Sequence, residues 1–98
     1  MDNAQLGRFS VQLPALTGVS DKQIAYGARC RSERIAGAAD LVINRPQFVA
    51  SPVATQEAFI AALVVIVSEQ TSASYWIDSS ATLARELAVR ASKIALSK

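Results

Sequence analysis

The residue types that most often perform catalysis are scarce in this chain of 98 residues. Histidine is absent and Cys30 is the single cysteine, so neither a Ser-His-Asp triad nor a Cys-His pair is available. The eight carboxylates do not cluster in the sequence, and no glycine-rich phosphate-binding loop is present. Because the usual general base is missing, we predict that the protein is not an enzyme and has no catalytic residue.

Metal and disulfide chemistry are limited by the same composition. One cysteine without histidine cannot supply the ligands of a structural zinc site, so we expect no metal site and no cofactor. A single thiol also excludes an intramolecular disulfide, which fits a reducing compartment. Cys30 is expected to be a small buried hydrophobic residue.

Basic side chains are the remaining candidates for function. The net charge is +2. From residue 79 onward the sequence contains four Lys and Arg residues and one acidic residue, Glu86. If the helices that carry the cations pack side by side, they form a positive surface for phosphates or an acidic protein face. The partner-binding residues that we predict are Arg29, Arg34, Arg85, Arg90 and Lys93. A merely solvated charged surface is the alternative.

Two other features each allow two interpretations. Arg31 falls on the apolar stripe of its predicted helix, where it is either an anchor for a partner or a buried arginine paired with Asp78 or Glu69. Tyr75 and Trp76 are either a binding hot spot or one core residue beside one boundary residue. We favour the structural interpretation in both cases.

These side chains have to be positioned by helices, and the most apolar stretch indicates the central one. Residues 59–67 contain no charge, amide or hydroxyl group, which predicts a helix over 52–69 that is apolar on every side. Its Ala61 and Val65 side must be covered by the N-terminal segment or, failing that, by a second copy of the chain.

Three further helices are predicted around this one. Ser20 and Gln23 form a capping box, so a helix begins at Asp21 and extends over 21–44, where Pro46 ends it. Residues 47–51 are expected to be a linker. Shorter helices are expected over 73–78 and 80–96, the last with an apolar face that contains Leu83, Leu87, Ala91, Ile94 and Ala95.

The N-terminal residues 1–18 are predicted to form an extended arm. Phe9, Val11 and Leu13 alternate with polar residues as in a half-buried strand, but no second convincing strand is present to pair with it. The arm is expected to lie on the helices or to pair with its copy in a homodimer. We therefore predict an all-α fold, a compact single domain over residues 1–98 with about four helices.

The location of the protein follows from two further observations. Asp2 and Asn3 stand where a signal peptide needs basic residues before an apolar run. The apolar run over 58–67 has about half the length of a membrane-spanning helix. We expect a soluble cytoplasmic protein that does not associate with membranes.

Two patches of the sequence resemble a group of small proteins from phages, plasmids and integrated elements. The first is LTGVSDKQIAY over 16–26, followed by Arg29 and Arg31, and the second is Trp76-Ile77-Asp78. The resemblance implies an accessory protein of a mobile element. Compact helical proteins of this size and origin include anti-CRISPR proteins, which cover surfaces of a host nuclease or surveillance complex.

The predicted function combines the missing catalytic groups with this resemblance. We expect a non-enzymatic binding protein of a phage or mobile element that inhibits a host CRISPR-type defence complex by occluding a protein surface. Its partner is then a host protein or ribonucleoprotein complex. Two alternatives stay open, a weak nucleic-acid-binding accessory protein and a structural homodimer.

Overall fold

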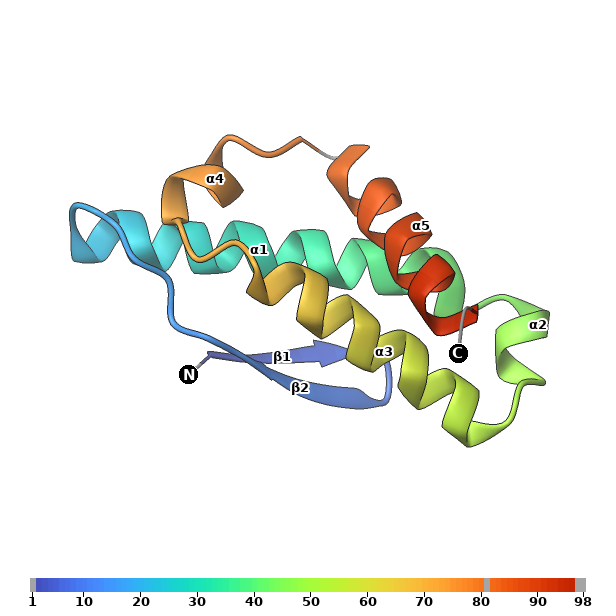
Figure 1. Cartoon of the computed structure of the whole chain (residues 1–98). Helices are drawn as coiled ribbons and strands as arrows, with labels where there is room; N and C mark the ends of the chain where they lie inside the picture. The colour runs from blue at the N-terminus through green and yellow to red at the C-terminus, as the bar shows by residue number, and fades with distance from the viewer. Residues whose placement is uncertain (1, 81, 97–98) are drawn as a thin grey trace.

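The architecture is a set of helices with a small β-hairpin on one side. The computed structural model describes residues 2–80 and 82–96. Within them the elements are β1 (Asp2–Leu6), β2 (Phe9–Leu13), α1 (Asp21–Ile43), α2 (Pro46–Val49), α3 (Val53–Ser68), α4 (Ala73–Ile77) and α5 (Thr82–Leu96). Figure 1 shows the long α1 with α4 and α5 on one side and the hairpin on the other, while α3 crosses in front. Four residues lie outside the described residues. They are residue 1 of the predicted arm, residue 81 of the predicted last helix, and residues 97 and 98 at the end of the predicted domain.

The prediction of an all-α fold is wrong, because the N-terminal segment forms a two-stranded antiparallel sheet. β1 pairs with β2 in a register that runs from Asp2↔Leu13 to Leu6↔Phe9. Side chains that stand directly opposite each other share a face of the sheet. The core-facing side therefore carries the apolar residues of both strands, and Asp2 lies at its far end.

A two-residue loop explains why the hairpin is difficult to predict from sequence. Gly7 has a φ of 61°, and Arg8, like every other non-glycine residue described, has a negative φ. A positive φ at the first loop residue alone fits a type II′ turn, which places glycine first. Gly-Arg is not one of the common hairpin dipeptides, and β1 offers only Ala4 and Leu6 as apolar residues. The first strand therefore lacks a clear signal of its own.

The predicted helices correspond to α1, α3, α4 and α5, with ends that differ by at most two residues. The N-cap bond of the predicted capping box is present, since Gln23 N–H donates to Ser20 Oγ at 3.1 Å. The Gln23 side chain accepts from Val19 N–H at 2.7 Å, one residue before the N–H of Ser20 that a capping box uses. The first bond satisfies a backbone donor that a helix start leaves without a partner, and the second satisfies a donor just before the helix.

The expected linker over 47–51 instead contains most of the short helix α2. Pro46 occupies the first position of α2, where its missing N–H costs nothing and its fixed φ suits a helix. The same proline that ends α1 thus begins the next helix. Phe48 of α2 then packs edge-on against Phe59 of α3, with ring centroids 5.7 Å apart.

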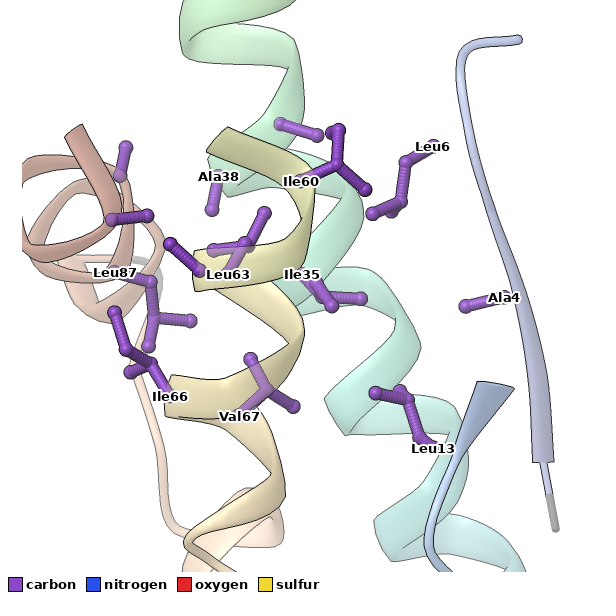
Figure 2. Close-up of a cluster of buried hydrophobic side chains, with 14 of the residues drawn as sticks. Ala4, Leu6, Leu13, Ile35, Ala38, Ile60, Leu63, Ile66, Val67 and Leu87 are labelled. Atoms are coloured by element: carbon purple, nitrogen blue, oxygen red, sulfur yellow. The ribbon is translucent and has the colours of Figure 1, made fainter. Parts of the chain in front are cut away.

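The core is built around α3. Figure 2 shows Leu6 and Leu13 of the hairpin pointing toward α1 and α3, while Leu63 and Ile66 of α3 point toward Leu87 of α5. All five side chains are buried. The hairpin, α1 and α5 thus each cover part of the circumference of α3.

One side of α3 is left open. Val65 is 62% exposed, and Ala61 is exposed beside it. The N-terminal segment therefore does not cover the side of the central helix that was expected to need a cover.

A close approach between α1 and α4 depends on a glycine. A Cβ atom at Gly27 would lie 2.7 Å from both Cα and Cβ of Ala73. Thr17, just before α1, holds the same region, since its carbonyl accepts from Ala73 N–H and its N–H donates to Thr71 O, both at 2.8 Å. The backbones of α1 and α4 therefore cannot separate easily to make room for a side chain.

We predict that Gly27→Ala destabilises the protein although alanine is the better helix former. The backbone clash should outweigh a propensity gain of about 1 kcal/mol and leave a net loss of about 1–3 kcal/mol. Urea denaturation followed by circular dichroism measures the change. Gly37→Ala is the matched control, because its Cβ would meet only the Ala84 methyl group at 3.3 Å. A variant Gly27→Ala as stable as Gly37→Ala would contradict the close packing.

Candidate functional site

Arg31 is a buried structural residue rather than an exposed anchor. Its side chain is fully buried, and Nη2 lies 2.7 Å from Asp2 Oδ2 while Nη1 donates to Pro14 O, also at 2.7 Å. The predicted partners Asp78 and Glu69 are not involved. Burial lowers the pKa of the Arg31 guanidinium, and the charge and hydrogen bond of Asp2 act in the opposite direction. The pair fixes β1 and the end of β2 against α1.

Arg34 contacts the connection between α4 and α5. Its Nε donates to Ser79 Oγ and its Nη2 donates to Ser79 O, both at 3.1 Å. Ser79 Oγ in turn donates to Trp76 O at 2.5 Å. A guanidinium that makes two bonds to one residue holds that residue in a defined orientation. Arg34 therefore stabilises the position from which the chain enters α5.

Two of the other predicted cations form ion pairs within the protein. Arg29 Nε lies 3.6 Å from Glu33 Oε1 on the same helix. Arg90 Nη2 on α5 lies 3.3 Å from Glu69 Oε1, just after α3. All four side chains are more than half exposed, so each pair contributes little to stability. The pairs do reduce the positive potential around Arg29 and Arg90.

Arg85 and Lys93 are the predicted residues that remain without an ion pair or hydrogen bond among the described residues. They lie on the exposed side of α5, eight positions apart, with Val89 midway between them. Residues four apart on a helix are neighbours on its surface. Val89 is 47% exposed. We refer to Arg85, Val89 and Lys93 as the α5 row.

The structure thus separates the five predicted residues into different environments. Arg34 contacts Ser79 before α5, Arg90 contacts Glu69 after α3, and Arg29 pairs along α1. Arg85 and Lys93, the two cations of the α5 row, are the members of the predicted set that are both exposed and unpaired within the described residues. The assignment of the five to partner binding stays a prediction.

The aromatic pair and the cysteine have the structural roles that were favoured. Trp76 is 1% exposed and donates from Nε1 to Gln70 O at 2.9 Å, while Tyr75 is 38% exposed beside it. Cys30 is buried and carries a free thiol. Trp76 is therefore a core residue and Tyr75 a boundary residue.

The described part of the chain offers few groups for other chemistry. Residues 2–80 and 82–96 contain no cluster of three or more His, Cys, Asp or Glu side chains suited to a metal ion. In the same residues, no helix combines the length and apolar character needed to cross a bilayer. The exposed helix faces carry the remaining side chains of interest, among them the α5 row.

No protein-family model, curated protein or solved structure matches this chain at a significant level. The function therefore has to be inferred from the surfaces described above.

Sequence reasoning missed a buried polar cluster around Gln56. This residue is 5% exposed, accepts a hydrogen bond from Arg8 Nη2, and donates from Nε2 to the carbonyls of Phe48 and Ser51 at 3.0 Å. It therefore joins the hairpin turn, α2 and α3. The signal for this cluster in the sequence is weak. It is a single glutamine in the first turn of a helix whose residues 59–67 are all apolar.

We predict that Asp2→Ala destabilises the protein more than Arg31→Met does. Removing Asp2 leaves a buried cation without its carboxylate, which should cost about 1–2 kcal/mol because the carboxylate is partly exposed. Arg31→Met removes the cation and also Nε, a buried atom without a hydrogen-bond partner, and leaves a carboxylate that is 44% exposed to water. Urea midpoints of both variants test this order. A greater loss for Arg31→Met would show that packing of its side chain dominates.

Proposed function

We propose that this protein is a non-enzymatic binding protein of a mobile element, which occludes a surface of a host protein or ribonucleoprotein complex. The observation that carries the proposal is the α5 row, an exposed valine with one exposed cation on each side of it. A partner helix or loop with acidic groups around an apolar centre would fit this row.

The row combines two contributions to binding. Arg85 and Lys93 can accelerate and orient association with an acidic surface, because charge complementarity acts mainly on the encounter and its specificity. Val89 supplies apolar area between them that becomes buried on contact. Neighbouring Glu86 is exposed on the same helix and would oppose an acidic partner that approached from its side, which restricts the orientation of binding.

A protein partner is favoured over nucleic acid by the distribution of charge. Arg29 and Arg90 are already paired with carboxylates, so fewer cations are free to neutralise phosphates. An exposed valine in the middle of the row adds nothing to a phosphate contact. Weak nucleic-acid binding remains the alternative that a salt titration distinguishes, since counterion release would make the affinity fall steeply with salt.

The identity of the partner as a CRISPR-type defence complex, in the cytoplasm of the host, rests on the sequence resemblance alone. The motif LTGVSDKQIAY lies across the start of α1, and its Gln23 and Ser20 are used for helix capping. The second motif contains Trp76, whose role is in the core. The motifs therefore describe the scaffold, and the α5 row is where we expect the partner to bind.

We predict that the double variant Arg85→Glu/Lys93→Glu loses partner capture and keeps the stability of the unaltered protein. Both side chains are exposed and make no bond within the described residues, so charge reversal should change the melting temperature little. Tagged protein expressed in a bacterium with an active CRISPR-type system should co-purify with subunits of that complex, identified by mass spectrometry. The same cells should tolerate a plasmid that the system normally destroys.

Lys22→Glu is the control, because Lys22 is an exposed cation in the first turn of α1, away from the α5 row. It should keep capture and plasmid survival. If no subunit of a defence complex co-purifies, the proposed partner is wrong. If the double variant captures the complex as well as Lys22→Glu does, the α5 row is not the contact surface.

A further inference from the structure

An apolar groove lies between β2 and α3, on the side of the molecule away from α5. It has a volume of about 460 Å³, and its lining includes Phe9 and Val11 from β2 and Ala61, Val64 and Val65 from α3. Val65 is 62% exposed there. Glu57, at one end of the groove, is the single charged residue of α3.

The outer edge of β2 borders this groove and is unpaired. Leu6 and Phe9 flank the two-residue loop and so form a hydrogen-bonded pair, and such pairs alternate along an antiparallel ladder. The backbone N–H and C=O groups of Ser10 and Gln12 therefore point away from β1. They have no hydrogen-bond partner among the described residues.

This edge lacks the features that normally prevent strand pairing. β2 contains no charged residue, no proline and no bulge within its ladder, whereas exposed edges are commonly protected by one of these. The edge and the groove together present backbone hydrogen-bonding groups beside an apolar surface. An added strand would pair with the backbone groups of the edge, and an added helix face would cover the apolar groove.

A second copy of the chain supplies both. β2 and α3 run in the same direction, since Arg8 at the start of β2 bonds Gln56 in the first half of α3, and Thr17 after β2 bonds Thr71 after α3. A two-fold axis beside Val11, midway between β2 and its copy, makes the two strands antiparallel. Ser10 then stands opposite Gln12 of the copy, and every outward N–H of both strands finds a carbonyl.

The same axis brings the two α3 helices together in an antiparallel arrangement. Arg8 lies beside Gln56 and Thr17 beside Thr71, so the part of α3 that lies beside Val11 is near Ala61. Ala61 is therefore close to the axis, and its small side chain permits a close approach of the two helices. The two copies of Glu57 then lie at opposite ends of the interface, where water can reach both of them. Apolar residues therefore meet at the centre, and no like charges are buried or opposed.

We propose that this face is the interface of a two-fold homodimer, in which β2 pairs with β2 and α3 packs along Ala61, Val64 and Val65. The dimer has one continuous sheet across the axis. Figure 1 shows α5 on the opposite side of the molecule from the hairpin, so the α5 row stays accessible in both copies. The interface is independent of the proposed function.

Light scattering during size-exclusion chromatography tests the proposal at micromolar concentrations. The unaltered chain should have twice the monomer mass of 10.4 kDa. Val65→Asp should raise the dissociation constant at least about tenfold, because it places an unpaired carboxylate in an apolar interface. Val89→Asp is the matched control, an exposed valine on α5 that should leave the dimer intact. A monomeric unaltered protein, or a Val65→Asp dimer of normal affinity, would overturn the proposal.

The pairing of strands has a separate test that does not depend on Val65. Gln12→Pro removes an outward N–H of β2, and Asn3→Pro removes the equivalent outward N–H on the opposite edge, since the two residues face each other in the ladder. Gln12→Pro should be monomeric and Asn3→Pro dimeric, with similar circular dichroism spectra. Equal dimerisation of both variants would show that β2 is not at the interface. Capture of an unrelated strand-forming peptide by a monomeric chain would assign the groove to that peptide instead.

Discussion

The structure depends on one requirement, which is that α3 has to be covered on nearly every side. Its sequence from Phe59 to Val67 contains no polar side chain, so each neighbouring element is an apolar surface placed against it. The hairpin, α1 and α5 occupy three sides, and Phe48 of α2 closes the N-terminal end. The remaining side, at Ala61 and Val65, is the one that the protomer itself leaves in contact with water.

Polar contacts set the positions of the covering elements. Arg31 ties both ends of the hairpin to α1, Gln56 ties its turn to α2 and α3, and Arg34 holds the segment before α5. Each of these side chains bonds a backbone carbonyl or a residue distant in sequence. Apolar packing alone tolerates many arrangements, whereas a buried polar group is satisfied in few of them.

Much of the helical structure was predictable from local patterns, and the hairpin was not. Ser20 and Gln23 indicate the start of α1, and the apolar residues 59–67 indicate α3, because both signals lie within one element. The pairing of β1 with β2 depends instead on Gly7 and on helices far along the chain that the inner face packs against. Likewise, the distribution of the predicted basic residues could not be foreseen. Glu33 shares a helix with Arg29 and lies four residues away. Glu69 lies near Arg90, and Ser79 near Arg34, only once the chain has folded.

The position of the hairpin before α1 and α3 in the chain has a consequence for the order of folding. β1 and β2 are adjacent in sequence, yet the residues that bury their inner face come from α1 and α3. An isolated two-stranded hairpin is at best marginally stable in water. Because both strands precede α1 and α3 in the chain, during synthesis they emerge before the helices that cover their inner face and acquire these packing partners only when α3 has followed. The hairpin is thus completed later than it is made, and the uncharged edge of β2 is exposed to other chains in the interval.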